Sequence, residues 1–278
     1  MKKHIFLFTF LCITAIAFAQ KKDKIKGSKV VTIEQKQIES FTGLEVTDNI
    51  EVMLTSGNEC ALEIEADDNL HDAISISLSG STLRLSTLKD IIGYKKLTVR
   101  LTYTADFKLV VAKNEAQVTA ITDIENDGIV FRSYDYAKLF LNANTTTFSL
   151  ECNDKSKVDL NLKTEKATIN VSKNATLKAL IKSKQMIFDM YQKAEATIEG
   201  DVVDLKLRLD NNATFVGKNL AIQNVDITTE GSSNASINAT KTAIIDAAGK
   251  SQIQLYGDQK IEIRRFMESA VLMKKLPK

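Results

Sequence analysis

Apolar and polar residues alternate along much of the chain with a period of two. In residues 175–181 the odd positions are small or apolar, while Thr176 and Lys178 are polar, and residues 167–171 alternate in the same way. This period predicts β-strands with one buried and one solvent-facing side, because a helix would space its apolar residues three to four apart. Between the runs lie Asn, Asp, Lys, Ser and Gly, which are typical of turns.

A short phrase with a small residue returns throughout residues 114–271. The small residues lie 16 to 22 positions apart, at Ala116, Ala137, Ser156, Ala175, Ala196, Ala213, Ala235, Ser251 and Ser269. A strand-rich repeat of roughly 20 residues is the signature of a solenoid. The sequence therefore predicts an all-β fold, a right-handed parallel β-helix in which the Ala/Ser positions stack beside an Ile/Leu/Val ladder. An antiparallel sandwich is disfavoured, because only Asp127-Gly128 has the sequence of a hairpin tip within the repeats.

The first residues have the form of a secretory signal peptide. Lys2-Lys3 precede an apolar run that ends in Ala17-Phe18-Ala19, and the run is too short to span a membrane. We expect residues 1–19 to be removed by cleavage after Ala19, and no lipid anchor on Cys12. Residues 20–29 are polar and lysine-rich, which predicts a flexible leader.

Residues 30–105 predict a β-rich N-terminal module that leads into the β-helix repeats of residues 106–278. Its expected strands are 30–35, 41–46, 50–55, 60–66, 74–78, 82–86 and 97–104. Turn residues at 56–58 and 79–81 favour β-hairpins. Asp67–Asp72 predicts one helical turn, because Asp and Asn favour helix starts.

The free ends of a solenoid invite pairing with other chains. We expect the N-terminal module to cover one end. At the other end, Arg264-Arg265 and the tail Lys274–Lys278, with the only proline of the chain, predict a C-terminal cap. Deletion of everything after Ile263 is therefore expected to cause aggregation.

Charge and composition exclude several classes of function. The chain has 37 Lys and Arg against 35 Asp and Glu, so loss of Lys2 and Lys3 leaves 35 of each. A balanced surface argues against nucleic acid as a partner. No later stretch is apolar enough for a membrane span. The oligomeric state is left open.

The sequence predicts no metal, cofactor or catalytic residue. Asp67, Asp68 and Asp72 could approach a calcium ion, but their spacing matches no calcium loop, so a surface turn is the preferred interpretation. His71 is the only histidine after the signal peptide, which disfavours a serine hydrolase. Cys60 and Cys152 each fall on the apolar side of an alternating strand, so we expect buried, unreactive free thiols. In an exported protein the two could also form a disulfide.

A polysaccharide-active enzyme is the main catalytic alternative. Stacked coils could bring Asp189 and Asp210 together beside Arg208, and glycoside hydrolysis needs two carboxyl groups at a set separation. The chain has no Trp, and its tyrosines at 134, 136 and 191 form no evident platform for a sugar. We therefore expect no enzymatic activity.

Several N-terminal motifs resemble the putative auto-transporter adhesin family, also called the head GIN domain. They are Phe41-Thr42-Gly43-Leu44-Glu45-Val46, Asp48-Asn49-Ile50-Glu51-Val52, the segment from Glu63 to Leu70, and Gly80-Ser81-Thr82-Leu83-Arg84-Leu85. The resemblance covers roughly residues 40–270 and implies a cell-envelope β-helix of Bacteroidetes with a suspected binding role. The family supplies no catalytic residues to transfer, and fold alone does not imply function.

Together these observations predict an exported, non-enzymatic β-solenoid that binds a glycan or a protein through its polar face. Its place is the periplasm, the outer surface or the extracellular space. The alternatives are a polysaccharide-active enzyme and a purely structural envelope protein.

Overall fold

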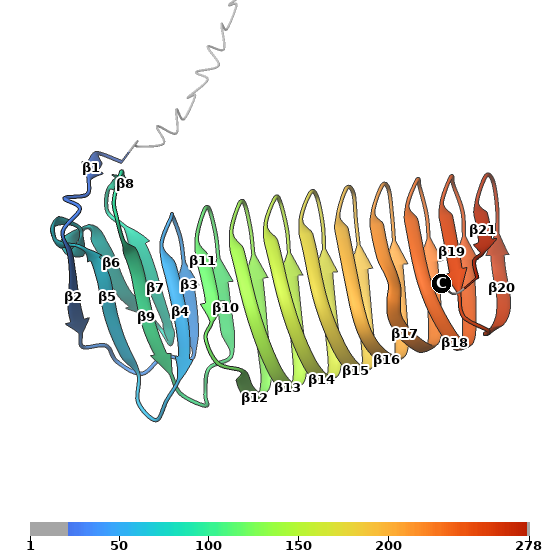
Figure 1. Cartoon of the computed structure of the whole chain (residues 1–278), viewed down its shortest axis with the longest axis horizontal. Coiled ribbons are helices and arrows are strands. Elements are labelled where there is room, and N and C mark those ends of the chain that lie inside the picture. The colour runs from blue at the N-terminus through green and yellow to red at the C-terminus, as the bar shows by residue number, and fades with distance from the viewer. Residues whose placement is uncertain (1–21, 277–278) are drawn as a thin grey trace, which may run out of the picture.

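The computed structural model describes residues 22–276, so the predicted signal peptide lies outside the described part. The chain is 67% strand and 2% helix and forms a β-solenoid of about 9 turns. Figure 1 shows the coils stacked side by side along one rod. The predicted all-β β-solenoid is confirmed.

Most coils consist of one long strand that bends from one face of the rod to the other. Burial alternates along β13, is interrupted by two exposed neighbours at Thr146-Thr147, and then resumes. Each long strand pairs in parallel with the next, so equivalent residues stack in rows. The long strands are β12 (Ile124–Ser133), β13 (Lys138–Cys152), β14 (Lys157–Val171), β15 (Thr176–Met190), β16 (Glu195–Leu209), β17 (Thr214–Thr229) and β18 (Asn234–Ala247).

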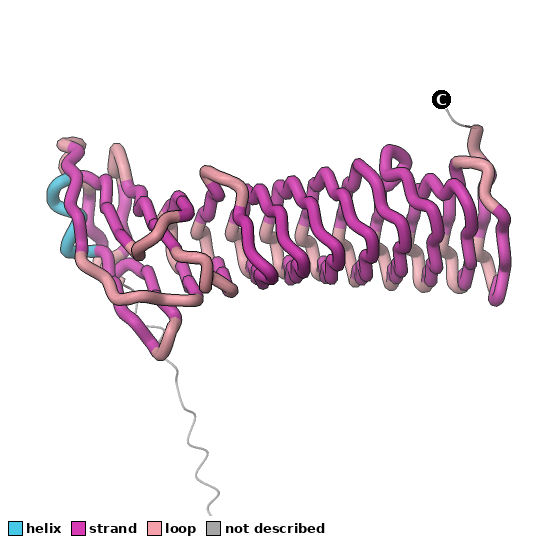
Figure 2. The backbone as a smooth tube through the Cα atoms, turned by 90° about the horizontal axis from the view of Figure 1, so that it is seen from below, coloured by secondary structure: helices cyan, strands magenta, loops and turns pink. Residues whose placement is uncertain are grey.

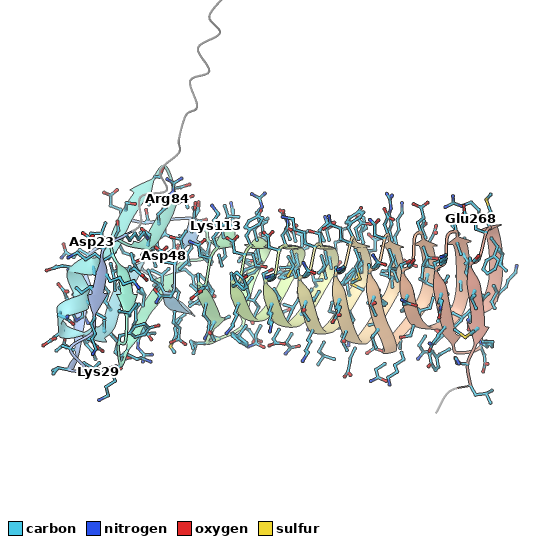
Figure 3. The ribbon with its side chains drawn as sticks, turned by 90° about the horizontal axis from the view of Figure 1, so that it is seen from above. Asp23, Lys29, Asp48, Arg84, Lys113 and Glu268 are labelled. Carbon is cyan, nitrogen blue, oxygen red and sulfur yellow. The ribbon has the colours of Figure 1, made fainter. Side chains whose placement is uncertain are left out.

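Tight turns close the coils along the upper edge of the rod in Figure 1. Each turn contains one residue with positive φ, and these residues follow one another 18 to 21 positions apart: Asn114, Asp135, Asp154, Lys173, Gln192, Asn211, Gly231, Gly249 and Glu268. Asn, Asp and Gly accept this left-handed conformation most easily. Figure 3 shows Glu268 at the far end of the rod from Asp48, which has the same conformation in an earlier turn.

The residue two positions after each left-handed residue is small because the rod is narrow at this edge. This inner row is Ala116, Ala137, Ser156, Ala175, Ala194, Ala213, Ser233, Ser251 and Ala270, and all but the last are buried. The predicted row is wrong at Ala196, Ala235 and Ser269, whose places belong to Ala194, Ser233 and Ala270. The pattern indicates Ala196 in place of Ala194 because alanines lie on both sides of Glu195. The left-handed turn residue that fixes the register differs from coil to coil, so the sequence does not mark it.

Ala196 instead belongs to the next inner row, where it compensates for a large neighbour. Phe215 stacks directly on Ala196 and on Ala235, one coil to either side. All three side chains are buried. The ring of Phe188 meets Phe215 edge-on, with centroids 5.4 Å apart. In these three coils the core therefore alternates small and large residues instead of repeating one size.

The order of coils at the N-terminal end differs from the order of the chain. The coil of β3 (Gly43–Val46) and β4 (Glu51–Ser56) lies between two later ones. On its outer side are β7 (Thr82–Thr87) and β9 (Leu97–Tyr103), and on its inner side are β10 (Leu109–Ala112) and β11 (Gln117–Ala120). Parallel stacking thus begins inside the predicted N-terminal module.

Antiparallel strands and a short helix close this end. β5 (Ala61–Asp67) lies antiparallel between β9 and β2 (Val31–Lys36), and β6 (Ile74–Ser79) is antiparallel to β7. The 3-10 helix η1 (Asp68–Ala73) confirms the predicted helical turn and buries Leu70. Figure 2 shows this helix at the tip of the rod.

Two local expectations need correction, and one is confirmed. The turn at residues 56–58 does not form a hairpin, because β9 lies between β4 and β5. The turn at Gly80, where φ is +60°, does join the hairpin β6–β7. The leader of residues 20–29, expected to be flexible, contains the strand β1 (Lys24–Lys26). This strand pairs in parallel with β8 (Asp90–Ile92), and the sequence pattern predicted neither strand.

The opposite end of the rod is formed by β19 (Gln252–Tyr256), β20 (Lys260–Phe266) and β21 (Val271–Lys274). Arg264 and Arg265, which the sequence suggested as part of a cap, reach back along the rod. Their guanidinium groups lie 3.3 Å from Asp226 and 3.0 Å from Glu230. They leave the last coil open.

Candidate functional site

The most distinctive hollow lies where the N-terminal loops meet the first regular coils. Its floor is an outward-facing row from five neighbouring strands: Thr98, Glu51, Gln117, Lys138 and Lys157. The adjoining turns contribute Glu115, Tyr136 and Lys155, and the loop of residues 94–96 forms a wall. We call this hollow of about 620 Å³ the junction trough.

The floor is ordered at one end by hydrogen bonds to Glu51. Thr98 Oγ1 donates to Glu51 Oε2 at 3.0 Å, and Gln117 Nε2 donates to Glu51 Oε1 at 3.2 Å. Both carboxylate oxygens are therefore engaged within the row. The two floor lysines, Lys138 and Lys157, form no ion pair or side-chain hydrogen bond within residues 22–276.

The wall loop is held by a buried carboxylate that the sequence offered as a calcium candidate. Asp67 is fully buried, and it accepts hydrogen bonds from the backbone amides of Lys95 and Lys96 at 3.0 Å and of Lys29 at 2.8 Å. Burial by itself raises the pKa of Asp67, but the three amides outweigh it and leave the pKa below its usual value. Asp67 thus fixes the backbone that carries Tyr94.

The trough carries an excess of positive charge. Five lysines line it, at 95, 96, 138, 155 and 157, against the two carboxylates of Glu51 and Glu115. Only Lys96 has an ion-pair partner among the described residues, Glu65 at 3.9 Å. The surplus cations are free to meet an anion from solution.

Two tyrosines provide flat apolar surface within this charged setting. The side chain of Tyr136 is 55% exposed. Lys155 Nζ donates to its hydroxyl at 2.9 Å, which raises the pKa of Lys155, and lies 4.9 Å from the ring centre. Tyr94 is half-buried, and its pKa is raised first by burial and then by Glu51 and Glu115. The Tyr94 phenol therefore remains a neutral hydrogen-bonding group at pH 7.

The other carboxylates proposed for calcium have protein partners or face solvent. Asp68 accepts a hydrogen bond from the Ser28 hydroxyl, and Asp72 is exposed. His71 is buried, with Nε2 2.8 Å from Thr32 Oγ1 and Nδ1 3.4 Å from Glu34. Within residues 22–276, no three His, Cys, Asp or Glu side chains are grouped so that they could hold a metal ion.

The candidate carboxylates Asp189 and Asp210 lie in neighbouring coils but not directly in register. Asp189 and Arg208 are neighbours in register on the outer face of β15 and β16. Asp210 lies in the following turn, where its carboxylate accepts the amide hydrogen of Asn211 at 2.6 Å. Arg208 lies over the ring of Tyr191 at 5.7 Å.

The two thiols are unpaired. Cys152 is buried, and burial raises its pKa, although the hydroxyls of Ser133 and Ser156 lie 3.5 and 3.3 Å from its sulfur. This agrees with the expected unreactive thiol. Cys60 is only partly buried, so the expectation of two buried thiols is wrong for that residue.

Comparison with known proteins identifies the class. The family model described as "Putative auto-transporter adhesin, head GIN domain" matches residues 40–258, and the chain belongs to this family. No functionally curated protein matches the sequence. No helix among residues 22–276 is long and apolar enough to cross a membrane.

Solved structures share the fold at low sequence identity. A putative adhesin from Parabacteroides distasonis has a TM-score of 0.69 at 18% identity, and one from Parabacteroides merdae has 0.67 at 18%. A putative lipid binding protein from Parabacteroides distasonis has 0.66 at 13% identity. Each comparison covers 91% of this chain and 100% of the other. Because these identities are low, the likeness shows the fold alone.

Proposed function

We propose that this protein is an exported, non-enzymatic binding module of the cell envelope that holds an acidic saccharide in the junction trough. The adhesin-like family supports an envelope or extracellular place, and the signal-peptide pattern of residues 1–19 supports export. The observation that carries the ligand class is the combination of unpaired lysines and an exposed tyrosine in one hollow.

The chemistry of the trough suits a sugar that bears a carboxylate or sulfate. Lys138 and Lys157 lie side by side on neighbouring strands, about 5 Å apart along the rod, so both ammonium groups can reach one anionic substituent. The exposed ring of Tyr136 offers a flat face against which the apolar side of a sugar ring can pack. Gln117 donates through its side-chain nitrogen to Glu51, so its side-chain oxygen faces the trough as an acceptor for a sugar hydroxyl.

The trough has the concave shape of a small-ligand site more than that of a protein interface. A volume of about 620 Å³ holds two or three sugar rings. Binding to lysines exposed to solvent is expected to weaken as salt rises, because salt screens charges at such distances. A polymer that repeats the same acidic unit would offer another unit whenever one leaves the trough, and this raises the overall affinity.

A glycan array tests this assignment. We expect the wild-type protein to retain glycans with uronic acid or sulfate groups, and Lys138→Glu combined with Lys157→Glu to lose that retention. The matched control is Lys163→Glu with Lys182→Glu, because these two exposed lysines are also neighbours in register but lie outside the trough. Equal loss in both double variants would contradict a role for the trough.

A reducing-sugar assay on the retained glycans separates the alternatives. Retention without product supports a binding module, whereas product release would show a polysaccharide-active enzyme. If neither the glycans nor a panel of envelope proteins is retained, the protein is a structural element of the envelope and the proposal fails.

A further inference from the structure

The last coil exposes residues that every preceding coil buries. Ile261 and Ile263 stack on the buried Ala243 and Ile245, so they occupy inward positions. They are nevertheless 39% and 51% exposed, and Phe266 is 42% exposed. Isolated apolar residues are common on surfaces, but here three inward positions of one strand meet solvent together.

The other end of the rod is different, because its core is covered. η1 and the antiparallel strands lie over it, and Leu62, Ile64, Ala66 and Leu70 are all buried there. Figures 1 and 2 show the contrast between the helix-covered tip and the open coil of β20 and β21. Head-to-tail stacking of copies would therefore place an open coil against a closed one.

The open end also has two free strand edges. β20 pairs only with β18, and β21 pairs only with β19, among the described residues. A twofold axis that runs across the end, perpendicular to both strands and to the rod, would set β20 antiparallel to its own copy. The same axis would set β21 antiparallel to its copy, so both edges would be satisfied in one step.

We propose that two copies of this chain associate through their open ends, with β20 of each pairing antiparallel about Ile263. The charges of β20 favour this arrangement. Within one copy, Arg264 lies 3.3 Å from Asp226 and 3.6 Å from Glu262, and it is the extra residue where the register of β20 shifts. Pairing about Ile263 brings the Glu262–Arg264 pair of one copy beside that of the other with opposite charges adjacent, whereas parallel pairing in register would set each charge against itself. Ile261, Ile263 and Phe266 would be covered by the same residues of the second copy.

This interface has a consequence for binding that is independent of what the trough binds. The two junction troughs lie in the distal halves of the joined rods, since each belongs to the N-terminal end of its own rod. The pair would thus present one site near each of its two ends. Such a dimer could bridge two surfaces or two points of one polymer, and the second contact would raise the overall affinity.

Sedimentation equilibrium over a dilution series tests the association. We expect the purified protein to have twice the mass of one chain, and Ile263→Lys to have the mass of one. Ile187→Lys is the matched control, because Ile187 is 47% exposed in the middle of the rod; it should remain dimeric. A wild-type monomer at every concentration, or a dimer that survives Ile263→Lys, overturns the proposal.

A second variant tests the register without requiring the interface to be broken. In a Cys60→Ser background, Ile263→Cys places two thiols across the twofold axis at a separation that a disulfide can span. We expect a disulfide-linked dimer on a non-reducing gel, and none from Ile187→Cys in the same background. Absence of the linked dimer from an associated Ile263→Cys protein would refute the proposed pairing.

Discussion

Replacing Phe215 by alanine tests whether the coils stack in the register described above. Phe215 is 1% exposed, and its direct neighbours in the row are Ala196 and Ala235. These methyl groups are too short to fill the space that the ring leaves. Loss of a buried Phe costs about 3–5 kcal/mol, and the edge contact with Phe188 adds about 0.5–1.5 kcal/mol to such pairs. We therefore expect Phe215→Ala to lower the free energy of unfolding by about 4 kcal/mol.

A second substitution in the adjacent coil distinguishes stacking from general destabilisation. Ala196→Leu alone overfills the row beside Phe215 and is expected to cost about 1–3 kcal/mol. Combined with Phe215→Ala, the leucine enters the vacated space, so the double variant should be more stable than the sum of the single changes by at least about 1 kcal/mol.

Urea unfolding followed by circular dichroism provides these values. The slope of the transition must stay constant, because a changed slope would show that single coils unfold separately. The control is Phe140→Ala, since Phe140 is 36% exposed, and its cost should be about 1 kcal/mol or less. Strictly additive effects of Ala196→Leu and Phe215→Ala would refute the assigned register.

Three further predictions concern backbone strain, pH and the open end. At Gly200, where φ is +109°, an added Cβ would lie 2.2 Å from the carbonyl oxygen of Ile181. At Gly80 an added Cβ would meet nothing within 4 Å, so Gly80→Ala should cost only about 1 kcal/mol, the cost of a left-handed backbone. Gly200→Ala should therefore lower the thermal midpoint much more than Gly80→Ala. The ionised form of Asp67 is favoured by folding, because its amide partners outweigh burial and lower its pKa. Its stabilising effect is present above about pH 4 and is lost as pH falls through the lowered pKa, so Asp67→Asn should flatten the fall of the urea midpoint in acid, and an unchanged profile would contradict this. Truncation after Ile263 removes the last three residues of β20 and all of β21. Because β21 pairs with β19, its loss frees the β19 edge and uncovers Ile253 and Leu255, so aggregation on size exclusion is expected; a well-behaved monomer would count against this.

The sequence predicts the fold class well because a solenoid repeats its pattern. Alternation at period two and recurring small residues indicate stacked strands without any long-range information. The exact row is harder to predict, because it depends on the left-handed turn residue. That position is occupied by Asn, Asp, Lys, Gln, Gly and Glu in different coils, so Ala196 could be mistaken for Ala194.

The N-terminal topology could not be read in the same way. Turn residues at 56–58 mark a change of direction correctly, but they do not show that β9 will enter between the strands on either side. The short strand β8 has no alternating pattern long enough to detect. Non-local pairings of this kind leave no local signal.

The trough was missed for the same reason. Tyr136 and Lys155 are adjacent only after winding, and Tyr94 joins them because Asp67, distant in sequence, binds the loop that carries it. The one available signal was the segment Tyr94-Lys95-Lys96, in which an aromatic residue and two lysines sit in a loop between expected strands.

Calorimetric titration of the protein with a trisaccharide of uronic acid tests the binding account most directly. The account predicts saturable binding at one site per chain, weakened by added salt, absent with the neutral trisaccharide of the same linkage, and lost when Lys138 and Lys157 become glutamate. Equal affinity for the acidic and the neutral sugar, or unchanged affinity in the double variant, would contradict it.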